Sequence, residues 1–292
     1  MSDTLAVDKR MVRRSFEQAA ATYDAAAVLQ NEVCRRMLAR LDFIKLEPAT
    51  ILDAGSGTGN AVAGLLARYS RARVIALDLA LAMARRARAR RPWWRGLFER
   101  GGARLAAVCG DIDQLPLASA CAGMVWSNLA IQWSNEPQRA FAEMHRVLAP
   151  GGLLLFSSFG PDTLKELRAA FQSVDRHTHV HRFTDMHDVG DMLVACGFAD
   201  PVMDMEVVTL TYADVRELMR DLKAIGAHNV TRGRPSALAG KSLLAKVARN
   251  YEPARREGRL PATFEVIYGH AWKPQPRITA DGKPIIPLKP VR

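Results

Sequence analysis

A glycine-rich turn follows the first strand-like segment of the 292-residue chain. Residues 50–54, Thr-Ile-Leu-Asp-Ala, predict a short buried strand that ends near Asp53, and Gly55, Gly57 and Gly59 follow at alternate positions. Glycines are needed where a backbone takes a positive φ or approaches a ligand closely, and a helical pattern starts directly afterwards. The spacing differs from the dinucleotide-binding G-x-G-x-x-G, so we interpret the turn as a nucleotide-binding loop of another kind.

Two later apolar segments also end in acids. Residues 73–78 predict a second strand that ends in Asp78, 19 residues after Gly59. That distance is close to the roughly 20-residue offset at which an acid meets ribose hydroxyls in doubly wound folds. Residues 105–112 predict a third strand, and we place its Asp111 at the adenine of a bound nucleotide. Ordinary strand-end acids are the alternative, but the coincidence of several spacings favours a site.

The elements that position these residues alternate along the chain. From residue 50 to residue 159, strand patterns and helical patterns follow one another, which predicts a parallel sheet with helices on both faces. Helical periodicity over residues 11–41 precedes the first strand. Two strand-like segments come late, at about 202–209 and 263–271, with helical patterns between them at about 212–226 and 234–251.

These patterns predict an α/β fold that is doubly wound around a mostly parallel, seven-stranded sheet. We expect a helical cap over residues 1–47 and one main domain over residues 48–272, with a helical insertion at about 211–258 before the last strand. Residues 273–292 include five prolines and show little periodicity, so we expect a disordered tail.

The composition is that of a soluble globular protein, with 49% hydrophobic and 24% charged residues. No apolar run reaches the roughly 18 residues that span a membrane, and the first ten residues lack a signal-peptide core. The four cysteines form no C-x-x-C pair, which indicates reduced thiols and a cytoplasmic location. His177, His179 and His181 are spaced like metal ligands, but we interpret them as solvated loop side chains and expect no metal.

Positive charge gathers in one part of the chain, whose formal net charge is +11. Residues 61–110 hold eleven arginines against only Asp78 and Glu99. Such a block attracts acidic partners by long-range steering, and its part from Arg85 to Arg95 is our candidate docking surface for an acidic carrier protein. No nucleic-acid-binding signature accompanies the block, which disfavours nucleic acid as the partner. A solvated, arginine-rich helix face is the alternative.

The pattern D-x-G-x-G-x-G over residues 53–59 resembles the S-adenosylmethionine loop of class I methyltransferases, which have a Rossmann-like fold. Longer segments resemble the malonyl-[acyl-carrier protein] O-methyltransferase family, most specifically the Ser-Asn-Leu-Ala and Gln-Trp within residues 126–133. The other matching segments are residues 15–24, 28–30, 52–59, 110–112, 115–117 and 222–227.

The resemblance implies S-adenosylmethionine as the cofactor and methyl transfer to the free carboxylate of a malonyl thioester. The thioester is carried by acyl carrier protein or by coenzyme A, and in this family its methyl ester primes the pimeloyl chain of biotin. The cofactor-binding residues that the resemblance implies are Asp53, Gly55, Ser56, Gly57, Gly59, Asp78, Leu79, Asp111, Ile112, Asn128 and Leu129.

A malonyl carboxylate is ionised at neutral pH, so the transfer needs orientation and a dry site rather than a general base. We expect a cation to hold the carboxylate and name Arg182 and Lys223 as candidates, with structural salt bridges as the alternative. The rings of Tyr23 and Trp133 can pack against the sulfonium, although both residue types are also ordinary core aromatics.

Residues 159–168 and 260–272 also resemble a second family with the same core, a mitochondrial complex I assembly factor regarded as a protein-arginine hydroxylase. A small-molecule or RNA methyltransferase is a third alternative. The carboxyl methyltransferase predicts a methyl-ester product, and the hydroxylase predicts no transfer to malonyl carriers. The RNA enzyme predicts strongly salt-dependent RNA binding.

Overall fold

We analysed a computed structural model of the chain, which describes residues 7–90, 104–172, 174, 177–227 and 241–276. Most of the predicted tail, residues 277–292, lies outside the described residues, as does the start of the helix expected at 234–251. None of the described helices is long and apolar enough to cross a lipid bilayer.

Seven strands form a single sheet in the order β3-β2-β1-β4-β5-β7-β6. The pairs among β1 to β5 are parallel, and β7 pairs antiparallel with both β5 and β6. This sheet confirms the predicted doubly wound, mostly parallel fold. The strands are β1 (Thr50–Ala54), β2 (Arg73–Asp78), β3 (Leu105–Cys109), β4 (Ala122–Ser127), β5 (Leu148–Phe159), β6 (Ala199–Tyr212) and β7 (Leu260–Trp272).

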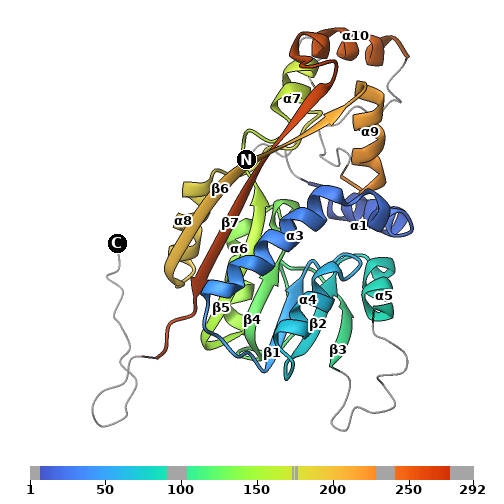
Figure 1. Cartoon of the computed structure of the whole chain (residues 1–292). Helices are drawn as coiled ribbons and strands as arrows, with labels where there is room; N and C mark the ends of the chain where they lie inside the picture. The colour runs from blue at the N-terminus through green and yellow to red at the C-terminus, as the bar shows by residue number, and fades with distance from the viewer. Residues whose placement is uncertain (1–6, 91–103, 173, 175–176, 228–240, 277–292) are drawn as a thin grey trace, which may run out of the picture.

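Helices cover both faces of the sheet (Figure 1). On one face, α3 and α4 contribute buried Val33, Met37 and Leu65, and on the other α6 and α8 contribute Phe141 and Leu193. The described helices are α1 (Lys9–Ala19), α2 (Tyr23–Ala26), α3 (Val28–Arg40), α4 (Asn60–Arg68), α5 (Leu81–Ala89), α6 (Pro137–Val147), α7 (Lys165–Gln172), α8 (Met186–Ala195), α9 (Val215–Ala224) and α10 (Lys241–Tyr251).

The long antiparallel strands β6 and β7 rise past the parallel part of the sheet, and α7, α9 and α10 gather at that end (Figure 1). Helix α1 lies between this group and α5 (Figure 1). It is anchored to α5 by the Glu17 carboxylate, which accepts hydrogen bonds from the backbone N–H groups of Leu81 and Ala82 at 2.7 and 3.0 Å. A carboxylate at the first turn satisfies N–H groups that have no partner inside the helix.

Two strand boundaries differ from those that the sequence predicts. Strand β3 ends at Cys109, so Asp111 lies beyond it and forms an isolated bridge with Gln114. Strand β5 begins at Leu148, directly after α6, although Pro150, Gly151 and Gly152 in the sequence predict a helix terminator with the strand starting at Gly152. The reason is that Leu148 already pairs with Ala122 of β4, and Gly151, at φ +77°, donates its N–H to the Lys273 carbonyl at 2.8 Å.

Candidate active site

The glycine loop between β1 and α4 has the conformation that its sequence predicts. Gly55, Gly57 and Gly59 have φ values of +81°, +54° and +84°, a region that other residues adopt only at a cost. A Cβ atom on Gly55 would lie 2.2 Å from the Cβ of Ala130, so a side chain does not fit there. The loop therefore needs glycine at position 55 for space as well as for backbone geometry.

Asp78, at the end of β2, holds this loop in place. Its carboxylate accepts hydrogen bonds from the N–H groups of Gly57 and Ala80 at 2.9 and 2.8 Å. Burial raises the pKa of Asp78 to about 6, although the two N–H donors lower it. Asp53 is buried behind the loop with an unpartnered Oδ2, and burial, followed by the charge of Asp78, raises its pKa to about 8.

A cavity of about 70 Å³ opens beside the loop, and we call it the cofactor cavity. It collects residues from the ends of the first four strands and from α1, as expected at the carboxyl edge of a doubly wound sheet. Three predicted residues, Asp53, Ser56 and Gly59, do not line it. The predicted residues that do are Gly55, Gly57, Asp78, Leu79, Asp111, Ile112, Asn128 and Leu129.

Helix α1 supplies the wall of the cofactor cavity that sequence reasoning missed. Lys9, Val12 and Phe16 line it. The Lys9 ammonium lies 2.8 Å from an Asp111 oxygen and 2.9 Å from an Asp113 oxygen, which joins the helix to the loop after β3. The helical spacing of Val12 and Phe16 is visible in the sequence, but it does not say against which element they pack.

The cofactor cavity fits S-adenosylmethionine. The positive-φ glycines leave backbone open where a side chain would otherwise stand. Asp78 and Asp111 line the cavity, and each carboxylate has lone pairs left to accept bonds from hydroxyl or amino groups.

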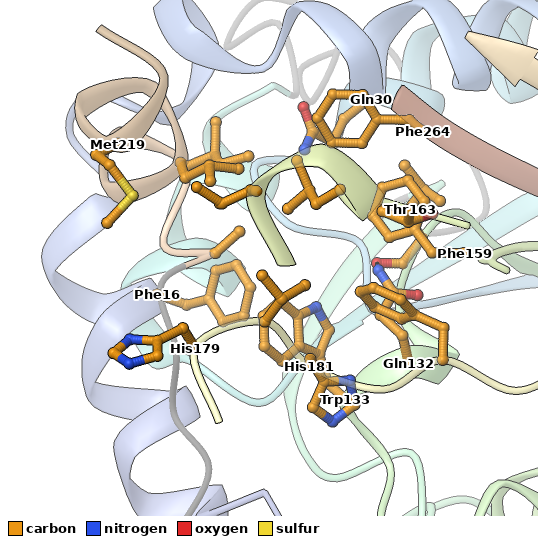
Figure 2. A pocket seen from close by; sticks show the side chains of 18 of the residues that line it. Phe16, Gln30, Gln132, Trp133, Phe159, Thr163, His179, His181, Met219 and Phe264 are labelled. Atoms are coloured by element: carbon orange, nitrogen blue, oxygen red, sulfur yellow. Dashed lines mark hydrogen bonds between the residues drawn. The ribbon is translucent and has the colours of Figure 1, made fainter. Parts of the chain in front are cut away.

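A second cavity, of about 170 Å³, adjoins the first, and we call it the acyl cavity (Figure 2). The two cavities share Phe16, Tyr23, Leu129 and Trp133. The other residues that line the acyl cavity are Gln30, Gln132, Phe159, Thr163, Leu164, Leu167, Phe171, His179, Val180, His181, Phe183, Met219, Leu222, Ile225, Ala227 and Phe264.

A hydrogen-bonded chain fixes the partition between the cavities. Leu129 has φ +49°, and its N–H donates to the Oγ of Ser157 at 3.0 Å. That hydroxyl donates to the side-chain oxygen of Asn128 at 2.9 Å, and the side-chain amide of Asn128 donates to the backbone carbonyl of Gln30 at 3.1 Å. A non-glycine residue at positive φ is strained, and such strain gathers where the surrounding structure imposes it, often at functional sites.

The four residues predicted for substrate and sulfonium contacts separate into two groups. Tyr23 and Trp133 line both cavities. Burial and the nearby Asp78 raise the pKa of Tyr23 above its usual range, so its hydroxyl stays protonated. Arg182 and Lys223 are exposed and line neither cavity. The structure therefore does not bring the two predicted cations to the acyl cavity.

The three histidines of residues 177–181 differ in their surroundings. His177 is exposed, while His179 stacks on Phe171 with ring centroids 3.9 Å apart. The prediction of a solvated side chain is wrong for His181, which lies 6.4 Å from Trp133 between ring centroids. Burial lowers the pKa of His181 to about 4. The described residues hold no cluster of three potential metal ligands.

Part of the arginine block is tied into the fold. Arg90 donates to the Thr58 carbonyl and pairs with Asp24, while Arg104 donates to three carbonyls that include that of Ala72. Arg85, Arg86 and Arg88 are exposed on α5. Arg91, Arg95 and Arg100 lie outside the described residues. The density of arginine along this stretch therefore overstates the charge that is free for docking.

Comparisons with known proteins agree with this architecture. Residues 52–156 match a family model described as "Methyltransferase domain". The YcgJ protein of Bacillus subtilis superposes with a TM-score of 0.57 at 14% identity, covering 82% of this chain and 99% of that one. The [4+2]-cyclase SpnF superposes with a TM-score of 0.51 at 23% identity, covering 84% and 82%. These likenesses show the fold, and the cyclase shows that the fold alone does not fix the reaction.

Sequence relatives are more specific. A malonyl-[acyl-carrier protein] O-methyltransferase of Gallionella capsiferriformans is 58% identical over 280 residues, covering 96% of both chains. A protein of the same name from Nitrosospira multiformis is 58% identical over 279 residues, covering 93% of this chain and 91% of the relative. With these relatives and its fold and site, the chain is a methyltransferase that uses S-adenosylmethionine and belongs to the malonyl-[acyl-carrier protein] O-methyltransferase family.

Proposed function

We propose that the protein methylates the free carboxylate of a malonyl thioester carried by acyl carrier protein. The relatives of highest similarity described above are named for this reaction. The product would be the malonyl methyl ester that primes pimeloyl synthesis for biotin.

Four cysteines are free, which supports a reducing compartment such as the cytoplasm.

The observation that best supports this function is the shared wall between the cavities. Because Phe16, Tyr23, Leu129 and Trp133 line both, a ligand in one cavity meets a ligand in the other at these side chains. Placing two reactants side by side is the main requirement of a displacement that needs no proton transfer, and good orientation can supply roughly 7–11 kcal/mol.

Different residues of the two cavities would bind the cofactor and exclude water. Asp78 and Asp111, which line the cofactor cavity, would hold the nucleoside, and Tyr23 and Trp133, which line both cavities, would pack their rings against the sulfonium. When bound, S-adenosylmethionine supplies a methyl group on a positively charged sulfur, which keeps the electron pair as the carboxylate oxygen bonds the methyl carbon. The apolar rings of the acyl cavity exclude water, which would otherwise solvate the nucleophile.

Mass spectrometry of malonyl carrier protein after incubation with enzyme and S-adenosylmethionine tests the proposal. We expect the acyl group to gain one methylene in mass and to lose it again on ester hydrolysis. Acetyl carrier protein is the matched control, since it has the same arm and thioester but no free carboxylate. An unmodified malonyl group, with hydroxylated arginine or methylated RNA in parallel assays, would contradict the proposal. Malonyl coenzyme A in the same assay shows whether the carrier is required.

A further inference from the structure

The described residues that line the acyl cavity include no aspartate, glutamate, lysine or arginine, although its proposed substrate is an anion. Arg182 and Lys223, the cations expected from the sequence, are exposed. A buried carboxylate is costly unless it is hydrogen-bonded and its charge is balanced. The described lining supplies no such charge, whereas a bound S-adenosylmethionine would bring one to the junction of the two cavities.

Three side chains of the acyl cavity hold a buried polar atom without a hydrogen-bond partner. These atoms are Oε1 of Gln30, Oε1 of Gln132 and Nδ1 of His181. The two glutamines are each only 9% exposed. Buried polar atoms are nearly always paired, so three unpaired ones around one cavity indicate a polar ligand. The two glutamine oxygens only accept hydrogen bonds and so suit N–H groups of the thioester's arm, whereas the Nδ1 of His181 can carry the proton that a carboxylate accepts.

Of the three side chains with an unpartnered atom, His181 lies close to Trp133, one of the residues that the two cavities share. Its ring lies near that of Trp133, which lines both cavities (Figure 2), with 6.4 Å between the ring centroids. The ring centroid of Phe183 is 5.3 Å away. Burial lowers the pKa of His181 to about 4, so the imidazole is neutral at physiological pH. With its proton on Nδ1, it can donate a hydrogen bond to a carboxylate without adding a charge.

We propose that the acyl cavity binds the substrate carboxylate through an uncharged hydrogen-bond donor, the imidazole of His181, and that the cofactor's sulfonium is its counter-ion. This inference rests on the proposed function and names how that site recognises its substrate. The positive charge of the bound cofactor takes the role that the sequence predicted for Arg182 or Lys223.

The chemistry of the transfer explains why a neutral cavity suits it. A carboxylate oxygen forms a bond to the methyl carbon while the S–C bond breaks and its electron pair stays on sulfur. One negative and one positive charge become a neutral ester and a neutral thioether, and no proton moves. A fixed arginine would hold the carboxylate in the ground state and would then remain buried without a partner beside the ester. Uncharged donors avoid both costs.

A binding experiment on the full-length wild-type protein tests the role of the cofactor charge. Malonyl-N-acetylcysteamine is titrated by calorimetry into protein saturated with sinefungin, which has an ammonium in place of the methylsulfonium, or with neutral S-adenosylhomocysteine. We expect the probe to bind at least about tenfold more tightly with sinefungin, because opposite charges attract strongly in a site of low dielectric. Equal affinities with the two analogues would overturn the inference.

Variants at position 181 test the positioning role. His181→Leu should weaken probe binding about tenfold with either analogue, and His181→Gln, which keeps a neutral donor, should restore most of it. His181→Lys should abolish the dependence on cofactor charge, because the protein then supplies the cation. His177→Leu, in the same segment but lining neither cavity, is the matched control and should keep the wild-type ratio. Unchanged affinity in His181→Leu would remove His181 from the proposal.

The binding titrations and the assay for methyl-ester formation together distinguish a failure of this inference from a failure of the proposed function. Methyl-ester formation with equal affinities for the two analogues would contradict the uncharged-cavity inference alone. If the probe fails to bind with either analogue and no ester forms on malonyl carrier protein, the proposed function itself fails. If His181→Leu does not fold, the wild-type ratio still decides the counter-ion role, and His181→Phe, a ring without a hydrogen-bond donor, tests the positioning role.

Discussion

The two cavities share a wall but differ in charge. The cofactor cavity holds Lys9, Asp78 and Asp111, whereas the described lining of the acyl cavity has no aspartate, glutamate, lysine or arginine. The acids of the first suit a ligand that brings a positive charge and hydroxyl groups. The neutral second cavity leaves that positive charge as the strongest attraction available to an anion. Binding of the cofactor can therefore raise the affinity of the second cavity for an anion, which is a coupling between the two sites.

The largest loss of cofactor affinity should follow from adding a side chain at Gly55, in the wall of the cofactor cavity. In Gly55→Ala the new Cβ would overlap the Cβ of Ala130, and alanine at φ +81° adds backbone strain. We expect cofactor affinity to fall more than about 100-fold, or about 2.7 kcal/mol, in calorimetric titrations.

Gly258→Ala is the matched control for Gly55→Ala. Gly258 has a similar φ of +75°, but a Cβ atom there would meet no atom within 4 Å. The control should lose some stability through strain and keep its cofactor affinity. Equal losses of affinity in the two variants would show that strain rather than overlap is responsible.

Removing the acid that holds the loop should have the next largest effect. Asp78→Ala deletes an acceptor that lines the cavity and also frees the N–H groups of Gly57 and Ala80. We expect the cofactor to bind about 1.5–3 kcal/mol more weakly, the range for hydrogen bonds to a charged group. Unchanged affinity in calorimetry would place Asp78 outside the cofactor site.

The cofactor cavity could be predicted largely from the sequence because its residues follow consecutive strand ends. Gly55 and Gly57 belong to one short motif, and parallel pairing must bring Asp78 to the same edge. Local sequence and one rule of sheet topology therefore suffice there. The fold was predictable for the same reason, since alternating strand and helix patterns fix a parallel sheet.

The acyl cavity could not be predicted in this way. Its wall combines Phe16 of α1, His181 of a loop, Met219 of α9 and Phe264 of β7. No short-range pattern states which of these distant segments meet. Arg182 and Lys223 have the right chemistry for a carboxylate, but the local backbone leaves both exposed. The neighbouring His181 lines the cavity instead, although its spacing with His177 and His179 in a polar segment predicted a solvated loop side chain.

The pH dependence of stability should report the buried acid behind the loop. The pKa of Asp53 rises from its ordinary 3.8 to about 8, mainly through burial, so the folded state holds the proton more tightly than the unfolded state. The free energy of unfolding should therefore fall as pH rises from about 4 to about 8, by up to about 1.4 kcal/mol per pH unit, and then level off.

Asp53→Asn should remove this contribution, because asparagine does not ionise. Urea unfolding at pH 5, 7 and 9 would show a flatter profile for the variant than for the wild type. Asp188→Asn on the exposed face of α8 is the matched control and should keep the wild-type profile. Parallel profiles for wild type and Asp53→Asn would contradict the predicted titration of Asp53.

The smallest expected effect concerns which cavity the carrier protein approaches. Arg86 and Arg88 are exposed on α5, beside the N-terminal helices. Arg182 and Lys223 are exposed next to residues of the acyl cavity, since His181, Phe183 and Leu222 line it. The thioester arm must enter the acyl cavity, so we expect the second pair to steer the acidic carrier.

Replacing each pair with glutamine compares the two surfaces directly. For Arg182→Gln with Lys223→Gln, kcat/KM for malonyl carrier protein at low ionic strength should fall about two- to fivefold with a flatter salt dependence. The turnover number at saturating carrier should hardly change, because neither side chain lines a cavity. Arg86→Gln with Arg88→Gln should leave both constants near the wild-type values. A larger loss in the α5 pair would assign docking to the arginine block, and a loss of turnover in the other pair would return a cation to the substrate site.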